Sequence, residues 1–209
     1  MNILLIGATG MVGSRILNEA VARGHSVTAA ARSPEKIAAQ AHVTPVGLDI
    51  NDTDAVIAQA RSADVIVSAV SPRNSGDALK DAAAFTDALI AAHQATDKRI
   101  VMVGGAASLH MPDGTPVVNF IPEEILPEAQ AMRRAYGTLV KEDIDFTVIA
   151  PGGMIAPGER TGQFRLAGRQ IVTNADGGMS NISAEDFAIA VLAEIETPQY
   201  HRTIANVGY

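Results

Sequence analysis

The chain of 209 residues contains no cysteine and no tryptophan. The missing cysteine excludes disulfide bonds, thiolate nucleophiles and cysteine-ligated metal sites. Aromatic residues make up only 4% of the sequence, so a hydrophobic core has to be built mainly from aliphatic side chains. Hydrophobic residues at 47% against charged residues at 19% exclude a disordered chain. The composition therefore predicts a globular protein with an aliphatic core.

Basic residues are also in the minority, with 16 Lys and Arg against 23 Asp and Glu, which gives a net charge of −7. This balance argues against nucleic acid as a partner, whereas an anionic small ligand stays compatible because a phosphate site is local. No apolar stretch reaches the ~18 residues of a membrane span. The N-terminus has no basic segment ahead of its short apolar run, unlike a signal peptide. We therefore expect a soluble, cytoplasmic protein that binds neither nucleic acid nor membrane.

Six short apolar runs without alternation predict strands that are buried on both faces of a parallel sheet. They lie at Ile3–Ile6, Ser26–Ala31, Val43–Leu48, Asp64–Ala69, Arg99–Val103 and Phe146–Ala150. Helical spacing occurs between them, at Val12–Val21, Ala82–Ala92 and Glu128–Glu142. Parallel strands need crossover helices, so the pattern predicts an α/β, Rossmann-like doubly wound fold, with a mostly parallel sheet and helices on both faces.

The last sixty residues follow a different pattern. The segment from Pro151 to Asn181 is rich in glycine and turn residues and has little periodicity. Ser183–Asp186 matches a capping box that opens a helix, and a strand near Ile204–Val207 is expected to close the sheet. Long loops in compact domains often carry function. The sequence thus predicts one Rossmann-like domain over 1–209, with a small substrate-side region at 151–183.

A glycine motif, Gly7-Ala-Thr-Gly10-Met-Val-Gly13, follows the first predicted strand and opens the first helix. At this spacing the first glycine allows a tight turn, the second lets the backbone approach a pyrophosphate, and the third lets the helix pack against the strand. The helix N-terminus adds partial positive charge. A purely structural turn is the alternative. The predicted dinucleotide contacts are Gly7, Thr9, Gly10, Met11, Val12 and Gly13.

The end of the second strand indicates which dinucleotide is bound. A carboxylate at this point would accept from a free ribose 2′-OH, but no acidic residue occurs between Glu19 and Glu35. Arg32 and Ser33 stand there instead, and a guanidinium can pair with a 2′-phosphate. We therefore expect NADP(H) to be preferred over NAD(H). Further contacts are predicted at the ends of the third and fourth strands, from Asp49, Ile50, Ala69, Val70 and Ser71.

Several motifs resemble those of the atypical short-chain dehydrogenase/reductases: Gly-Ala-Thr-Gly-x-x-Gly at the start, Ala-Arg-Ser after the second strand, and Ile-Ala-Pro-Gly near the sixth. Pro157-Gly-Glu-Arg-Thr-Gly162, followed by Phe164-Arg-Leu166 and Ile182-Ser-Ala-Glu-Asp186, resembles more narrowly the NADH-flavin reductase group, which is related to NmrA-like proteins. The resemblance covers essentially the whole chain. It implies an NAD(P)H-binding Rossmann fold and FMN or FAD as a substrate rather than a prosthetic group.

The larger family uses a tyrosine with a lysine four residues later, on one helix face. Here Tyr136 and Lys141 are five residues apart, which separates them by roughly 140° around a helix. Counting back from Ile149-Ala-Pro-Gly to the usual positions reaches Glu128 and Met132, and neither can take that role. Tyr136 is expected to be a partly buried packing residue. The sequence therefore disfavours the alcohol dehydrogenase mechanism and sugar epimerisation.

Hydride transfer to an electron-poor ring requires mainly that the ring stacks on the nicotinamide. Ser108 can bind an acceptor carbonyl and His110 can deliver a proton near neutral pH, while Met154 and Arg160 are expected to form the acceptor wall. No metal-ligand spacing is present. We predict an NADPH-dependent reductase of a small flavin- or quinone-like acceptor, acting as a monomer or homodimer. The alternatives are a non-catalytic NAD(P) sensor like the NmrA-like regulators, and an NAD-dependent epimerase or dehydratase.

Overall fold

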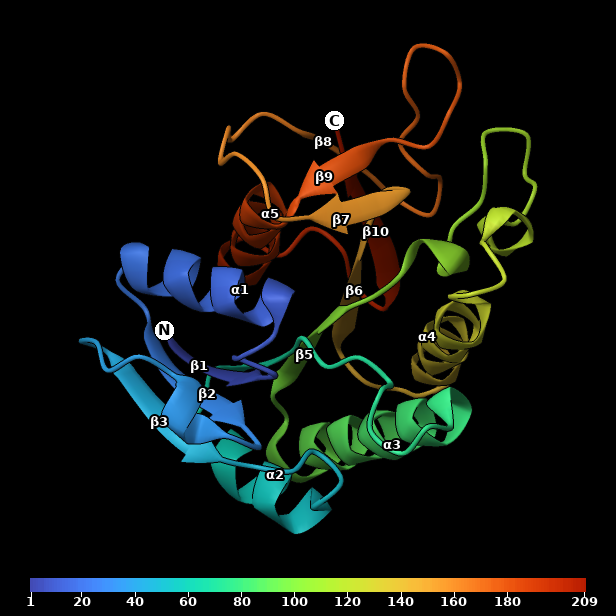
Figure 1. The fold of residues 1–209 in the computed structure, drawn as a ribbon. Helices are drawn as coiled ribbons and strands as arrows, with labels where there is room; N and C mark the ends of the chain where they lie inside the picture. Colours follow the sequence, from blue (N-terminus) through green and yellow to red (C-terminus); the bar gives the residue numbers. More distant parts are fainter.

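An eight-stranded sheet forms the centre of the computed structural model, which describes residues 1–209 (Figure 1). Its strand order is β3-β2-β1-β4-β5-β6-β10-β8. The strands are β1 (Asn2–Ile6), β2 (Ser26–Ala31), β3 (Val43–Gly47), β4 (Val65–Ser68), β5 (Arg99–Val103), β6 (Phe146–Pro151), β8 (Arg165–Ala167) and β10 (Thr203–Gly208). All pairs are parallel except β8 with β10. The order reverses between β1 and β4, which confirms the doubly wound fold.

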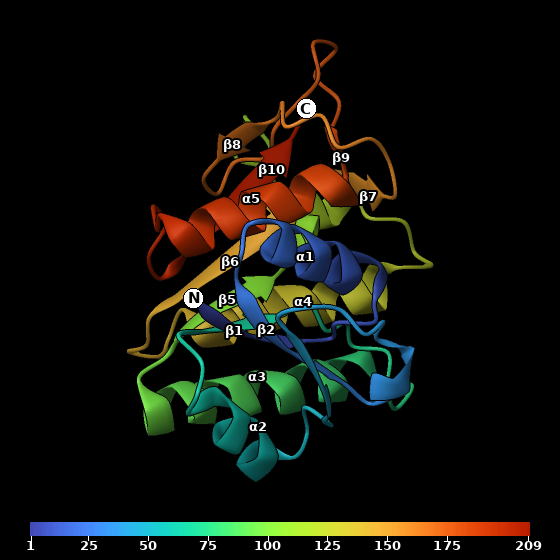
Figure 2. The same cartoon turned by 90° about the vertical axis from the view of Figure 1, so that its left-hand side faces the viewer.

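Helices cover both faces of the sheet, as Figure 2 shows. One layer holds α1 (Met11–Ala22) and α5 (Ala184–Glu196); the other holds α2 (Thr53–Ala60), α3 (Ala78–Thr96) and α4 (Leu126–Leu139). Helix α2 was not predicted from the apolar spacing, because it has eight residues and only two buried side chains. The side chain of Asp52 caps it by accepting from the N–H of Ala55 at 3.1 Å. No helix in the structure has the length and apolarity needed to cross a membrane.

The central strands are apolar on both sides because both faces are covered. In β1, Leu4 and Ile6 belong to the core beneath α2, α3 and α4, whereas Ile3 and Leu5 belong to the core beneath α1 and α5. The run predicted at 43–48 forms a strand, but not a buried one. It becomes β3 at the edge of the sheet, where Pro45 is exposed. An edge strand tolerates proline because one side of its backbone needs no partner.

The region 151–183 contains more regular structure than its composition suggested. The short strand β7 (Met154–Ala156) pairs in parallel with β9 (Asn181–Ser183) as a separate two-stranded sheet, and β8 extends the main sheet. Strands of three residues are too short to show periodicity. The N-cap half of the predicted capping box is confirmed, because the Oγ of Ser183 accepts from the N–H of Asp186 at 3.0 Å at the start of α5. The reciprocal bond is not formed, since the N–H of Ser183 donates to the hydroxyl of Tyr209 at 3.2 Å.

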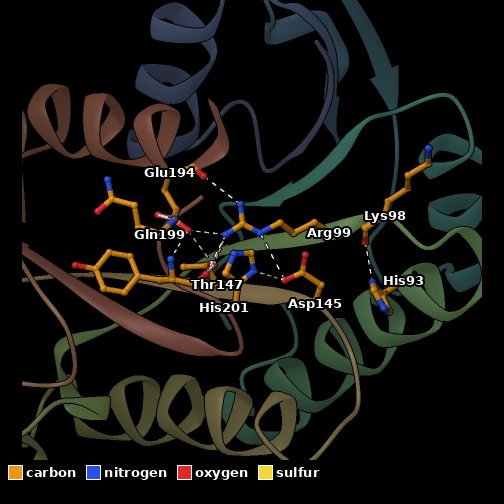
Figure 3. A network of polar contacts seen from close by, with 9 residues as sticks. His93, Lys98, Arg99, Asp145, Thr147, Glu194, Gln199 and His201 are labelled. Atoms are coloured by element: carbon orange, nitrogen blue, oxygen red, sulfur yellow. Dashed lines mark hydrogen bonds and ion pairs between the residues drawn. The ribbon is translucent and has the colours of Figure 1, made fainter. Parts of the chain in front are cut away.

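A buried ion pair ties α5 to the amino ends of β5 and β6 (Figure 3). The Arg99 guanidinium donates to Oε1 of Glu194 and Oγ1 of Thr147, both at 2.5 Å, and to the carbonyl of Tyr200 at 3.0 Å. The side chains of Arg99 and Glu194 are only 11% and 5% exposed. Ligands of open α/β sheets bind at the carboxyl ends of the strands, so this network lies on the opposite side from the expected site.

Candidate dinucleotide-binding site

A cavity opens at the carboxyl ends of β1 to β4, where the strand order reverses and open α/β sheets bind their ligands. It holds about 820 Å³ of space, a value that includes open solvent at its mouth. Its lining combines the glycine turn, the ends of β2 and β3, the chain after β4 and two side chains of α3. The residues are Ile6, Gly7, Thr9, Gly10, Ala31, Arg32, Leu48, Asp49, Ile50, Asn51, Ala69, Val70, Ser71, Arg73, Asn74, Asp81 and Phe85.

The three glycines of the turn have different reasons to lack a side chain. Gly7 has φ +89°, and a Cβ there would lie 2.8 Å from the carbonyl oxygen of Ala69. A Cβ on Gly13 would lie 2.0 Å from the carbonyl oxygen of Gly7. By contrast, the nearest atom to a Cβ on Gly10 would be 3.4 Å away. The fold therefore requires glycine at 7 and 13, whereas a Cβ at Gly10 would make only an ordinary contact, and Gly10 lines the cavity, where a ligand can approach the backbone.

The N-terminus of α1 adds positive potential to this turn. Gly10 is the N-cap, no side chain caps the helix, and the first turn holds no acidic residue. The first N–H groups are thus left for another acceptor. Thr9 and Gly10 line the cavity, whereas Met11, Val12 and Gly13 continue into α1 and lie outside its lining.

Two charged side chains from neighbouring strand ends reach the cavity. Arg32, exposed after β2, donates from Nη1 to Oδ1 of Asn74. Asp49 follows β3, and its Oδ1 accepts from the backbone N–H and the Nδ2 of Asn51, at 3.0 and 2.9 Å. Ser33 lies outside the lining, at the start of the 3₁₀ helix η1 (Pro34–Lys36). The end of β2 therefore presents a cation and no carboxylate.

The loop Ser71–Asp77, which we call the strap loop, supplies cavity residues that the sequence analysis missed, Arg73 and Asn74. Asp81 of α3 anchors it by accepting from the N–H groups of Asn74 at 2.5 Å and Ser75 at 2.9 Å. Hydrogen bonds from the side chain and backbone of Ser75 and from Asn74 hold the pKa of Asp81 below its usual range. The sequence signal that could have indicated Arg73 and Asn74 is the position of this loop, directly after the fourth buried strand.

The two candidate catalytic residues lie outside the cavity lining. Ser108 ends the 3₁₀ helix η2 (Ala106–Ser108), is 5% exposed, and its Oγ is buried without a hydrogen-bond partner. A buried hydroxyl in this state costs about 1–3 kcal/mol. His110 is half-buried, and two backbone hydrogen bonds connect it to the chain around Arg169. Its N–H donates to the carbonyl of Arg169 at 3.0 Å, and its carbonyl accepts from the N–H of Ile171 at 2.9 Å.

The two residues expected to form the acceptor wall also lie outside that lining. Met154 is 63% exposed on β7. Arg160 donates from Nε and Nη2 to the two carboxylate oxygens of Glu19 on α1, both at 3.0 Å. The hydrogen bonding to Arg160 is the main cause that lowers the pKa of Glu19. Burial acts in the opposite direction, and Arg23 lowers the pKa further. Glu19 is 7% exposed, so its charge needs such partners.

The segment Pro157–Gly162, on which the narrower resemblance rests, is held against the N-terminus of α5. Gly158 donates its N–H to Glu185 at 2.8 Å, and Thr161 and Gly162 donate theirs to Asp186 at 2.9 and 2.8 Å. Burial alone would raise the pKa of Asp186, but these bonds, with those from the hydroxyls of Thr161 and Tyr209, lower it. The motif therefore fixes the loop to the helix.

No tyrosine and lysine combine into a proton-donating pair. Tyr136 on α4 is 7% exposed and packs edge-on against Phe146, with ring centroids 6.5 Å apart. Lys141 follows the end of α4 and is exposed. Glu128, near the place where the family has its tyrosine, accepts from Nε of Arg73 at 2.8 Å instead. The packing role expected for Tyr136 is confirmed.

Comparison with known proteins assigns this architecture to a family. The family described as NAD(P)H-binding matches residues 7–198. The chain belongs to the NAD(P)H-binding family. This assignment agrees with the glycine turn and with the cavity at the switch point of the sheet. The chain is thus a Rossmann-fold, oxidoreductase-like member of that family.

Three solved structures are similar over nearly their whole length. A “putative exported protein” from Burkholderia pseudomallei is 38% identical, with TM-score 0.89 and 100% of both chains covered. A “putative epimerase” from Bacteroides thetaiotaomicron is 36% identical, with TM-score 0.90, covering 100% of this chain and 96% of that one. SP1627, a “putative NADH-flavin reductase” from Streptococcus pneumoniae, is 30% identical, with TM-score 0.84, covering 100% and 99%. The three names differ, so the fold does not by itself specify the reaction.

Proposed function

We propose that this protein is an NADPH-dependent reductase that passes hydride to a flavin- or quinone-like acceptor, with FMN or FAD as substrate. The observation that carries the proposal is the cavity itself. Gly10 lines the cavity without a side chain at the uncapped N-terminus of α1, and Arg32 stands at the end of β2 where a carboxylate would select NADH. A pyrophosphate fits the first feature and a 2′-phosphate fits the second.

The chain's own residues divide the work of binding along the cavity. Thr9 and Gly10, with the first N–H groups of α1, hold the pyrophosphate. Asp49 and Ile50 contact the adenosine, with Arg32 and Ser33 at its 2′-phosphate. Ala69, Val70 and Ser71, after β4, contact the half that carries the nicotinamide, and this ring supplies the hydride when bound.

The acceptor site needs little acid–base chemistry for such a reaction. An electron-poor ring has to stack on the nicotinamide, and its proton can come from water. The unpartnered Oγ of Ser108 can bind an acceptor carbonyl, and His110 lies two residues further along the chain. Met154, on β7 just after β6, offers an exposed apolar side chain for the acceptor to pack against.

A non-catalytic NAD(P) sensor is the second candidate. The observation that favours it is the burial of Tyr136 and the absence of a tyrosine–lysine pair, which leaves the cofactor cavity without a dedicated proton donor. The same absence argues against an epimerase or dehydratase, despite the name of the Bacteroides relative, because these reactions need such an acid and base.

NADPH oxidation, followed by absorbance, with FMN, FAD, riboflavin and a panel of quinones as acceptors distinguishes the candidates. The reductase predicts saturable turnover with at least one acceptor. The matched control is Gly10→Val, which should lose this turnover while it stays folded. Tight NADPH binding by the wild type with no turnover on any acceptor would overturn the reductase in favour of the sensor.

A further inference from the structure

The strap loop is fastened to the protein at three points. Beneath it, Asp81 accepts from the backbone N–H groups of Asn74 and Ser75. On the α4 side, Arg73 donates to Glu128 at 2.8 Å. At the end of β2, the side chain of Asn74 accepts from Arg32. The backbone of Asn74 is thus fixed by one contact while its side chain meets the arginine in another.

The partner of Arg32 is a neutral amide, and this matters for an anionic ligand. A carboxylate in the same place would neutralise the guanidinium and repel a phosphate. An amide oxygen takes one of the five guanidinium N–H donors and leaves the positive charge uncompensated. Arg32 is therefore oriented, yet it keeps donors for a bidentate contact with a phosphate.

We propose that Asn74, placed by Asp81, is a positioning residue that sets the cofactor specificity of this site by orienting Arg32 toward the 2′-phosphate of NADPH. The inference rests on the proposed function, because it requires a dinucleotide in the cavity. Asn74 acts through Arg32: it lowers the conformational freedom that the long side chain loses on binding. Its effect falls on the ratio of NADPH to NADH affinity, not on dinucleotide binding as such.

Two substitutions at this position give different expected results. Asn74→Ala frees Arg32, and NADPH affinity should fall on the order of threefold to tenfold, the effect of one ordinary hydrogen bond. NADH affinity should stay within about twofold, because NADH has no group at this point. Asn74→Asp pairs Arg32 with a carboxylate, so it should lower the ratio further than Asn74→Ala does.

Asn51→Ala is the matched control, since Asn51 lines the same cavity and donates to Asp49 rather than to Arg32. It should change both affinities by the same factor. A second control is Asn74→Ala in an Arg32→Ala background. If Asn74 acts through Arg32, the second substitution adds nothing to the loss of preference.

Calorimetric titration of the full chain with NADPH and NADH at one fixed salt concentration tests the inference. The inference is supported if the ratio of NADPH to NADH affinity drops with Asn74→Ala and drops further with Asn74→Asp. In the Arg32→Ala background, Asn74→Ala should leave this ratio unchanged. If the wild type prefers NADPH and Arg32→Ala removes the preference, yet both Asn74 variants keep it, the inference fails alone. If the wild type binds neither dinucleotide, or binds NADH at least as tightly, the proposed function or its cofactor preference fails as well.

Discussion

Two arginines, at opposite ends of the same sheet, are bound in opposite ways. Arg99, at the amino ends of β5 and β6, is 11% exposed and bonds to a carboxylate, a hydroxyl and a carbonyl (Figure 3). Arg32, at the carboxyl end of β2, is exposed and bonds to the neutral side chain of Asn74. The first charge is paired with a buried carboxylate of the protein. The second is held in place but not neutralised, which is the state that suits an anionic ligand.

The comparison separates arginines that stabilise the fold from those available to a ligand. Arg160 belongs with Arg99, because it contacts both oxygens of the buried Glu19 on α1. The sequence analysis had placed Arg160 beside the acceptor. The bond to Glu19 holds the loop 157–162 against α1, and the contact with an acceptor stays a prediction.

The largest expected effect concerns the glycine turn. Gly10→Val should lower dinucleotide affinity by on the order of a hundredfold or more, because its side chain fills space that the pyrophosphate needs. The protein should stay folded, since the nearest atom to a Cβ at this position is 3.4 Å away. Gly13→Val is the contrasting variant: its Cβ would lie 2.0 Å from a backbone oxygen, so it should disrupt the fold itself. Calorimetry and circular dichroism measure the two properties.

Near-wild-type affinity in folded Gly10→Val would move the phosphate site away from this turn.

Among substitutions of charged side chains, Arg99→Ala is expected to have the largest effect on stability, and no effect on cofactor preference. Removing the arginine leaves Glu194 buried without a counter-charge, at a cost of about 3–5 kcal/mol in the free energy of unfolding. The ratio of NADPH to NADH affinity should not change. Arg202→Ala is the control, because Arg202 pairs with Asp143 at the exposed surface and should cost about 0–1 kcal/mol. Urea unfolding gives both values; equal costs for the two variants would contradict the structural role of Arg99.

We expect stability to fall in acid because the carboxylate of Asp186 holds the loop 157–162. The pKa of Asp186 is lowered in the folded protein, so its contribution is fully present above its unfolded value of about 3.9. It is lost as the pH falls through that value toward the folded one. Asp186→Asn should therefore flatten the dependence of the unfolding midpoint on pH below about pH 5. If the unfolding midpoint of the variant depends on pH as steeply as that of the wild type, Asp186 does not contribute to this loss of stability.

The smallest effect is expected for Arg160→Ala. The dissociation constant of NADPH and the acceptor KM should both stay within about twofold of wild type, because the side chain points to Glu19 and not into the cavity. The melting temperature should fall modestly, since Glu19 keeps Arg23 as a partner at 2.8 Å. A selective rise in acceptor KM would return Arg160 to the acceptor wall.

Much of the fold could be predicted because its signals are local. The buried strands are short continuous apolar runs, and the glycine motif sits between the first strand and the first helix. The errors have physical causes. The strands β7, β8 and β9 have three residues each, too few for a pattern, and β3 is exposed because topology places it at an edge.

The sequence could predict only those cavity residues that directly follow a strand. Arg32 and Asp49 follow strands directly, and the structure places both in the cavity lining. The role of Asn74 depends on Asp81 and Arg32, seven and 42 residues away, and the partner of Arg160 lies 141 residues away. Pairings at that range depend on the folded topology and leave no periodic signal in the sequence.

The most direct test of the central claim is titration of the wild type and Arg32→Asp with NADPH and NADH at fixed salt. A guanidinium that pairs with the 2′-phosphate makes charge-assisted bonds of roughly 1.5–3 kcal/mol. The wild type should therefore prefer NADPH by on the order of ten to a hundredfold, toward the lower end because the site is exposed. Arg32→Asp should invert the preference, since a carboxylate repels the phosphate and accepts from a free 2′-OH. A wild type that binds NADH at least as tightly as NADPH would contradict the account, whatever the variant does.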